Sequence, residues 1–225
     1  MSSRIRGCVF DAYGTLLDLS SAVTSQAAAL GPGAPAFLAL WRAKQLEYTW
    51  LRTLMGRHAD FAQVVADALD YACAATGTDG PGLRQALFRG FERLAPYPDA
   101  RTTLQRLRAL GLRSVVLSNG TPAMLEASLE TNGLAPLLDA VLSVEAVGRY
   151  KPAPAVYALA TEALGAAPDE LLFVSANAWD IAGAGSAGLV TAWINRSGAP
   201  AERLPEPPSY ELTALSDVPD IVTGE

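Results

Sequence analysis

The sequence predicts an α/β protein in which helices cover both faces of a parallel β-sheet and a helical domain follows the first strand. Short, fully apolar runs alternate with helical segments from residue 97 onward. This pattern is typical of parallel strands buried on both faces. Residues 20–95, by contrast, are rich in Ala and Leu at helical spacing and contain no convincing strand. They are therefore predicted to form an inserted helical domain.

The predicted elements follow one another with clear boundaries. The apolar run at residues 8–10 is the first strand and ends at Asp11. Residues 99–110 form a helix that stops at Gly111. Thr121 and Pro122 occupy the N-cap and first positions of the next helix. Further elements are expected as strands at 114–117, 140–143, 171–174 and 189–194, helices at 154–164 and 180–187, and a surface loop at 198–210 before a final short element.

Polar residues gather where the predicted strands end. In parallel sheets covered on both faces, ligands bind outside the carboxyl ends of the strands. The alternation of elements therefore predicts one site at this edge of the sheet. The side chains expected there are Asp11, Ser118, Asn119, Ser175, Asn177 and Asp180.

Composition restricts the partners. The 225 residues include 17 basic and 23 acidic ones, which gives a net charge of −6. The sequence has no basic run and no interleaving of aromatic and basic residues, so a nucleic acid is not expected. A small anionic substrate would have to be attracted by local cations.

Cysteine usage and hydropathy bear on location. Cys8 and Cys73 lie far apart in the sequence, which favours reduced thiols and a cytoplasmic location. The first apolar run is too short for a signal peptide. No apolar stretch is long enough to cross a membrane, so no membrane partner is expected.

The segment after the first strand carries the clearest chemical signal. A buried strand that delivers Asp11 to its end, followed by a turn at Gly14 and Thr15, suits a nucleophile held out of bulk water. Tyr13 stands two residues after this aspartate; its phenol cannot replace a carboxylic acid as the proton donor to a leaving group. The alternative is an aspartate that only caps a loop.

Two later segments add polar groups at strand ends. Ser118 and Asn119 can hold a carboxylate or a halide by hydrogen bonds, although Ser-Asn-Gly is also ordinary turn chemistry. Lys151 precedes a proline-rich stretch, which predicts an extended loop from which its ammonium neutralises a carboxylate. The alternative is a surface lysine. Asp180 can equally be the N-cap of the helix predicted at 180–187.

Three strings together resemble the haloacid dehalogenase superfamily and, within it, the L-2-haloacid dehalogenases. They are Asp-Ala-Tyr-Gly-Thr at 11–15, Trp-Arg-Ala-Lys-Gln-Leu-Glu-Tyr at 41–48 and Lys-Pro-Ala-Pro-Ala-Val-Tyr at 151–157. The resemblance implies a Rossmann-like core of residues 1–17 and 96–225 with an α-helical cap domain of residues 18–95. It also implies hydrolytic dehalogenation of small (S)-2-haloalkanoic acids to (R)-2-hydroxy acids and halide through an ester on Asp11.

The motifs and the resemblance together assign the site residues. The resemblance implies that Arg42 binds the departing halide, whereas an arginine on a helix is otherwise solvated. Ala43 departs from the glutamine that the family often carries there. The expected catalytic set is Asp11, Thr15, Arg42, Ser118, Lys151, Tyr157, Ser175, Asn177 and Asp180. The expected substrate-binding set is Ala12, Tyr13, Arg42, Leu46, Phe61, Ser118, Asn119 and Trp179.

Tyr13 and Asn177 stand where magnesium phosphatases of the superfamily place acidic ligands, so neither a metal nor another cofactor is expected. The alternatives are a magnesium-dependent phosphomonoesterase of the same superfamily and a non-catalytic binding domain on the same fold. A homodimer is compatible with the apolar insert. His58, the only histidine, is expected to be solvated and without a role.

Overall fold

The protein is built around a parallel sheet. The computed structural model describes residues 5–78 and 80–224. Its sheet is six-stranded, in the order β3-β2-β1-β4-β5-β6, and every neighbouring pair is parallel. The strands are β1 (Gly7–Phe10), β2 (Arg113–Ser118), β3 (Ala140–Ser143), β4 (Leu171–Ser175), β5 (Val190–Ile194) and β6 (Tyr210–Leu212). This arrangement confirms the predicted fold class.

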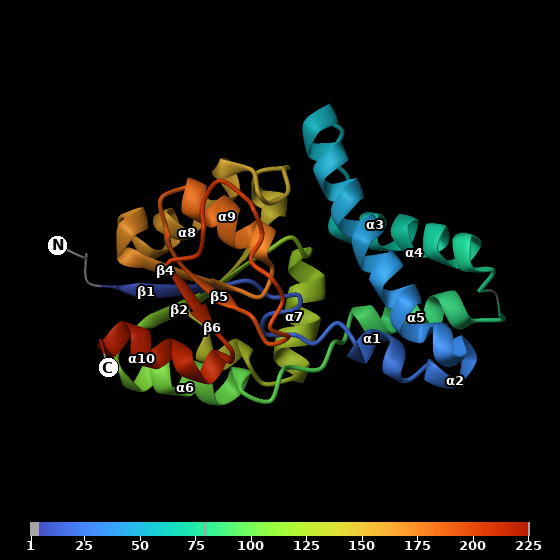
Figure 1. The fold of residues 1–225 in the computed structure, drawn as a ribbon, viewed down its shortest axis with the longest axis horizontal. Coiled ribbons are helices and arrows are strands. Elements are labelled where there is room, and N and C mark those ends of the chain that lie inside the picture. The colour runs from blue at the N-terminus through green and yellow to red at the C-terminus, as the bar shows by residue number, and fades with distance from the viewer. Residues whose placement is uncertain (1–4, 79, 225) are drawn as a thin grey trace.

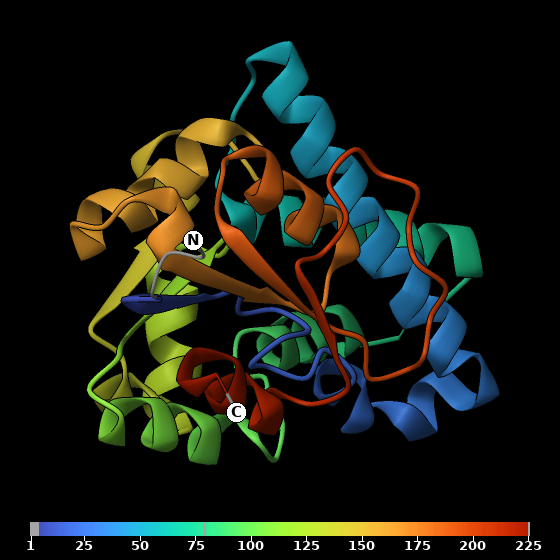
Figure 2. The same ribbon diagram turned by 60° about the vertical axis from the view of Figure 1, so that its left-hand side comes forward.

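Helices cover both faces of the sheet. Figures 1 and 2 show α8 and α9 on one face and α6 and α10 on the other. Thr121 caps α7 as predicted, because its Oγ1 accepts a hydrogen bond from Met124 N at 3.3 Å. The helices of this part of the chain are α6 (Ala100–Ala109), α7 (Pro122–Thr131), α8 (Pro154–Leu164), α9 (Ala178–Ser186) and α10 (Val218–Thr223), with short 3₁₀ turns at Ala135–Leu137, Val144–Ala146, Pro168–Glu170 and Leu215–Asp217.

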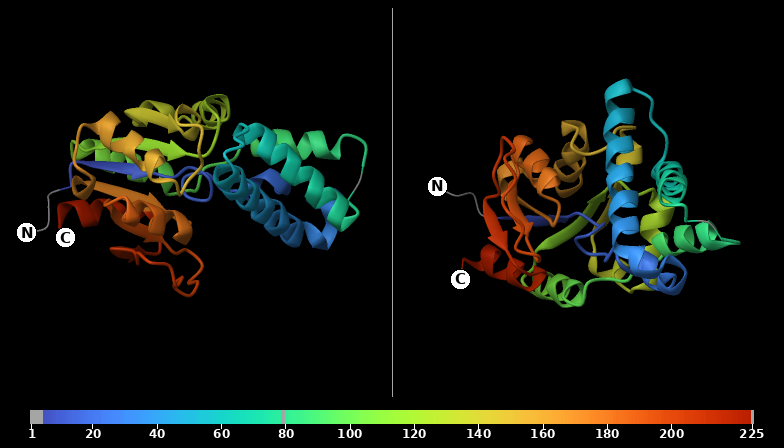
Figure 3. Two further views of the ribbon diagram at one scale, coloured as in Figure 1. Left: turned by 90° about the horizontal axis from the view of Figure 1, so that it is seen from above. Right: turned by 45° about the vertical axis from the view of Figure 1, so that its right-hand side comes forward.

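The segment between β1 and α6 is helical, as its composition predicts. It contains α1 (Ser21–Thr24), α2 (Ala27–Leu30), a 3₁₀ turn (Gly31–Gly33), α3 (Ala34–Met55), α4 (Phe61–Thr76) and α5 (Leu83–Phe91). The Trp41 indole N–H on α3 donates to Val65 O on α4 at 3.0 Å, which joins the two longest of these helices. Figure 3 shows this group as a separate lobe beyond the edge at which the strands end.

The chain enters and leaves the helical lobe through two adjacent segments. Leu17 forms an isolated bridge with Pro96, and Asp18 N donates to Ala95 O at 2.8 Å. These contacts support our proposal that the core comprises 1–17 and 96–225 and the cap 18–95. Residues 1–4 and 225 of that core and residue 79 of that cap lie outside the described residues.

The core surrounds the strands and continues into the helical lobe. Phe10 pairs in register with Val116 and Val174, so β1 lies between two strands that are buried like itself. Within residues 5–78 and 80–224, no helix is both long enough and apolar enough to cross a membrane.

Candidate active site

The turn after β1 places a carboxylate at the carboxyl edge of the sheet. Asp11 follows the last residue of β1, its N–H donates to Val174 O at 3.0 Å, and it is only 5% exposed. Gly14 adopts φ +87°, a left-handed conformation in which a side chain would be strained. The chain therefore reverses direction immediately after β1, which brings the Thr15 side chain next to Asp11.

The two oxygens of Asp11 have different surroundings. Oδ2 accepts hydrogen bonds from Thr15 Oγ1 at 2.9 Å and from Asn177 Nδ2 at 2.8 Å, with Ser175 Oγ at 3.4 Å. Oδ1 accepts from Lys151 Nζ at 3.2 Å. Oδ2 is therefore held by neutral donors, while Oδ1 faces one cation.

A second carboxylate lies on the other side of Lys151. Asp180 Oδ2 accepts from Lys151 Nζ at 2.7 Å, and its Oδ1 accepts from the Tyr157 hydroxyl at 2.7 Å. Asp180 is fully buried. Burial raises the pKa of its carboxyl to about 6, although the Lys151 ammonium acts in the opposite direction. Burial also raises the pKa of Tyr157 well above its usual value, so this phenol stays a hydrogen-bond donor.

These contacts overturn the two structural alternatives for Lys151 and Asp180. Lys151 is 1% exposed and is not a surface residue. Helix α9 begins at Ala178 with Asn177 as its N-cap, so Asp180 lies within the first turn and the prediction of a helix start at 180 was wrong. Its carboxylate binds Lys151 and Tyr157 instead of capping the helix.

Several donors at this edge of the sheet have no partner within 5–78 and 80–224. They are the hydroxyl proton of Ser118, the Asn119 Nδ2 group and the backbone N–H groups of Ala12 and Tyr13. Ser118 Oγ accepts from Gly120 N, and Asn119 Oδ1 accepts from Lys151 N at 3.1 Å, which leaves their donor atoms available. Unpaired donors beside a buried carboxylate suit an anionic substrate.

Tyr13 forms an apolar wall next to Asp11. Its ring packs against Phe91 and Phe61, with centroids 5.2 and 5.5 Å apart. A Cβ atom at position 120 would lie 2.7 Å from Tyr13 Oη, so Gly120 makes room for the phenol. Burial raises the pKa of Tyr13, and the ring stays neutral.

The inserted helices contribute the remaining predicted residues. Arg42 is partly buried on α3, and its Nη1 lies 3.4 Å from Oε1 of the buried Gln45. Burial lowers the pKa of the Arg42 guanidinium, and the negative charge of Asp11 opposes that effect, so the two charges interact. Leu46 is partly buried one helical turn further along α3, and Phe61 is buried at the start of α4.

Trp179 packs edge-to-face against Trp50, a residue that was not predicted from the sequence. The rings of Trp179 on α9 and Trp50 on α3 lie 5.6 Å apart at 78°. Trp50 stands four residues after Leu46 and eight after Arg42, on the same face of the helix. Helical spacing could therefore have identified it.

His58 is exposed, as expected from the sequence, but its ring also has partners in the core domain. Its Nε2 lies 2.9 Å from Glu145 Oε2, and its ring packs against Tyr150 with centroids 5.1 Å apart. The other oxygen of Glu145 accepts from Phe61 N at 3.3 Å. This contact links the helical lobe to the 3₁₀ turn after β3, and no local sequence signal pointed to it.

The donor set around Asp11 does not fit Mg²⁺. This ion is held by oxygen ligands, among them one or two carboxylates that face it together with waters. Here the Asn177 amide and the Lys151 ammonium point at the two Asp11 oxygens, and Tyr13 is turned into an aromatic cluster. Among residues 5–78 and 80–224, no group of three or more His, Cys, Asp or Glu side chains could hold a metal.

A parallel sheet that presents a buried aspartate beside a shared lysine, under an inserted helical lobe, defines a hydrolase that uses a carboxylate nucleophile. The chain belongs to the haloacid dehalogenase-like hydrolases, whose family pattern it matches over residues 5–188. It is 45% identical to (S)-2-haloacid dehalogenase 1 of Pseudomonas sp. (strain CBS-3) over 219 residues, covering 97% of this chain and 96% of the relative.

Solved structures agree with this assignment. A dehalogenase crystal structure has a TM-score of 0.94 and 43% identity, and covers 97% of each chain. The L-2-haloacid dehalogenase of Xanthobacter autotrophicus with chloropropionic acid covalently bound has a TM-score of 0.89 and 38% identity, and covers 98% of this chain and 99% of that one. The predicted family resemblance is therefore confirmed.

Proposed function

We propose that this protein hydrolyses small (S)-2-haloalkanoic acids to (R)-2-hydroxy acids and halide through an ester on Asp11. The unequal surroundings of the two Asp11 oxygens carry the proposal. Among the described residues, three neutral donors lie around Oδ2 and one donor, Lys151, lies at Oδ1, so Oδ1 keeps more of its lone-pair directions free to attack a substrate. The relatives named (S)-2-haloacid dehalogenase support the same reaction and enantiomer.

In the first step, Asp11 Oδ1 attacks C2 of the substrate from behind the carbon–halogen bond. The new C–O bond forms as the halide leaves with the bonding electron pair. Arg42 and the Asn119 amide receive the halide, since both offer donors and Arg42 adds a positive charge. The Ser118 hydroxyl and the backbone N–H groups of Ala12 and Tyr13 hold the substrate carboxylate.

In the second step, water attacks the carbonyl carbon of the Asp11 ester. Asp180 accepts the proton, and a group with a pKa of about 6 suits general-base catalysis near neutral pH. The negative charge that develops on Oδ2 is stabilised by Thr15, Asn177 and Ser175, which already point at that atom. The bond between the acyl carbon and Oδ1 then breaks, the departing alkoxide oxygen takes back the proton that Asp180 accepted, and the hydroxy acid is released.

The remaining assigned residues shape and orient the site. Tyr157 fixes Asp180, and through it Lys151, because its hydroxyl donates to Asp180 Oδ1. Leu46, Phe61 and Trp179, together with the ring of Tyr13, provide an apolar wall for the substituent on C2. Configuration inverts, since C2 is attacked once and the second step does not touch it.

A chloride-release assay on the two enantiomers of 2-chloropropanoate tests the proposal. We expect chloride and (R)-lactate from the (S) acid, little turnover of the (R) acid, and unchanged activity after exhaustive EDTA treatment. A parallel assay of phosphomonoesters with Mg²⁺ tests the alternative. Retained configuration, or activity that requires Mg²⁺, would exclude the mechanism.

We also propose a homodimer and a cytoplasmic location. Large apolar side chains are exposed on the outer surface of α3 and α4, which suits contact with a second copy: Leu51, Leu54, Met55 and Tyr71. Light scattering on the purified protein tests the dimer. The buried thiols Cys8 and Cys73 suit a reducing compartment, and fractionation of the source cells tests the location.

A further inference from the structure

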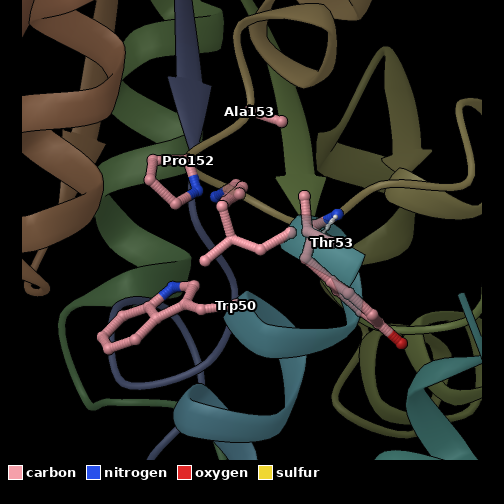
Figure 4. Close-up of a pocket in the computed structure, with 7 residues that line it drawn as sticks. Trp50, Thr53, Pro152 and Ala153 are labelled. Carbon is pink, nitrogen blue, oxygen red and sulfur yellow. Dashed lines mark hydrogen bonds between the residues drawn. The ribbon is translucent and has the colours of Figure 1, made fainter. Parts of the chain in front are cut away.

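A cavity of about 340 Å³ lies between the inserted helices and the loop that carries Lys151. Trp50 and Leu54 of α3 line one side, and the backbone and side chains of residues 150–153 line the other (Figure 4). Its size lies within the range of about 300–1,000 Å³ typical of small-molecule sites. Tyr150 N donates to Thr53 Oγ1 at 3.0 Å, which fastens the two sides together. The cavity is therefore a fixed feature of the interface between the lobes.

The cavity is lined mainly by apolar groups. The indole of Trp50 and the side chains of Pro152 and Ala153 surround it in Figure 4. Leu54, which is 82% exposed, marks its solvent side. Lys151 also contributes to the lining, but its ammonium is bound to Asp11 and Asp180. An occupant of this cavity must therefore be an apolar group rather than an anion.

Trp50 lines this cavity and also contacts Trp179, a residue of the proposed substrate pocket. One part of its indole lines the cavity, and its ring packs edge-to-face on Trp179, which we place in the wall around the C2 substituent. The Nε1 atoms of Trp50 and Trp179 are both buried, and neither has a hydrogen-bond partner among the described residues. Packing alone therefore holds the Trp50 ring, and its removal breaks no hydrogen bond.

We propose that the cavity is a subsite for the alkyl tail of longer 2-halo acids and that Trp50, by closing it, restricts the enzyme to short substrates. The inference rests on the proposed function. The halogen, C2 and the carboxylate stay beside Asp11, and only a chain that extends from C2 past Trp179 would enter the subsite. Trp50 is thus a specificity-determining residue.

The test compares kcat/KM for (S)-2-chlorohexanoate and (S)-2-chloropropanoate in the full-length enzyme. Each additional methylene that enters an apolar pocket is worth about tenfold or more in specificity. We therefore expect Trp50→Leu to raise the ratio of long to short substrate at least about tenfold. Adding Ala153→Phe should fill the cavity and remove the gain. Adding Ala155→Phe, the same change at an exposed position outside the lining, should leave the gain intact.

Each result has a defined meaning. An unchanged ratio in a folded Trp50→Leu variant, or a gain that survives Ala153→Phe, would overturn the subsite. If Trp50→Leu does not fold, Trp50→Phe retains an aromatic contact with Trp179, and a smaller gain is expected there; no gain would again overturn the subsite. Failure of the wild type to release chloride from (S)-2-chloropropanoate would instead reject the proposed function.

Discussion

Asp11 and Asp180 share a single ammonium: Lys151 Nζ lies 3.2 Å from Oδ1 of the first and 2.7 Å from Oδ2 of the second. All three side chains are at most 7% exposed. The guanidinium of Arg42 is a second positive charge that interacts with both carboxylates. Burial raises the pKa of Asp180, the more buried of the two, to about 6, and this makes the site sensitive to pH.

The first prediction concerns that sensitivity. The pKa of Asp180 is about 6, so the base of the second step is ionised above that pH and protonated below it. In the ester, Asp11 carries no charge, so one of the effects that raise the pKa of Asp180 is absent and the loss of rate begins below pH 6. We expect hydrolysis of the ester to slow as the pH falls, because only the ionised fraction of Asp180 accepts a proton. Mass spectrometry of enzyme quenched at pH 5 should detect the ester on the peptide that contains Asp11.

Asp180→Asn provides the control for this prediction. The amide cannot titrate, so the ester should accumulate at pH 5 and at pH 8 alike. A wild-type rate of ester hydrolysis that does not change between pH 5 and pH 8 would show that Asp180 is not the base.

The second prediction concerns Arg42. Arg42→Lys keeps the positive charge but loses the planar set of donors that faces the leaving halide. We expect turnover to fall about tenfold or more, which corresponds to about 1.4 kcal/mol in the barrier, with little change in melting temperature. Arg52→Lys on the same helix, where the arginine pairs with Asp67 at 2.9 Å, is the matched control and should retain turnover. Equal turnover in both variants would show that Arg42 does not act on the leaving halide.

The third prediction concerns the contact between Glu145 and the start of α4. Glu145→Ala removes the acceptor of Phe61 N and the partner of His58. We expect KM to rise about fivefold, as for the loss of a hydrogen bond worth about 1 kcal/mol, while kcat changes less. Glu145→Gln keeps an acceptor for Phe61 N, so its KM should lie close to that of the wild type. Equal KM values in the two variants would show that the contact does not position Phe61.

The periodicity of the sequence was sufficient to predict the sheet and the edge at which its polar residues meet. Short apolar runs favour buried strands, and parallel strands bring their carboxyl ends together. Ser175 and Asn177 therefore lie beside Asp11 as expected. The run at 140–143 is an exception to the burial, because β3 lies at the edge of the sheet and its Val141 is exposed. The start of α9 was predicted two residues too late, because aspartate is a common N-cap residue. Asp180 instead binds Lys151, a contact that local sequence does not reveal.

The contact between the helical lobe and the turn after β3 could not be predicted from the sequence. The pairing of His58 with Glu145 joins residues 87 positions apart, and neither residue stands in a motif. Trp50 was not predicted, for a different reason. A tryptophan on a helix is usually a core residue, and its contact with Trp179 and its place in the cavity lining become visible only in the structure. Local patterns thus identified the chemistry, while tertiary packing determined the shape of the pocket.

The last prediction follows the oxygen atom. If Asp11 Oδ1 attacks C2, the hydroxyl oxygen of the first product comes from the carboxylate and not from water. In a single turnover with excess enzyme in ¹⁸O-water, we expect unlabelled hydroxy acid and a labelled Asp11 peptide. Later turnovers should transfer the label to product. The Thr15, Asn177 and Ser175 contacts hold the other oxygen in place, so the two oxygens should exchange roles only as fast as the side chain can rotate.

Direct attack by water gives the opposite pattern. With Asp11 acting only as a general base, the first product would carry the label and the Asp11 peptide would remain light. Asp11→Asn distinguishes the two mechanisms further, because an amide is a poor nucleophile and cannot form the ester, so halide release should fall to background. The variant keeps the size of the side chain, so its melting temperature shows whether the loss reflects chemistry or folding. Measurable halide release by a folded Asp11→Asn variant, with label in the first product, would place the attacking oxygen on water.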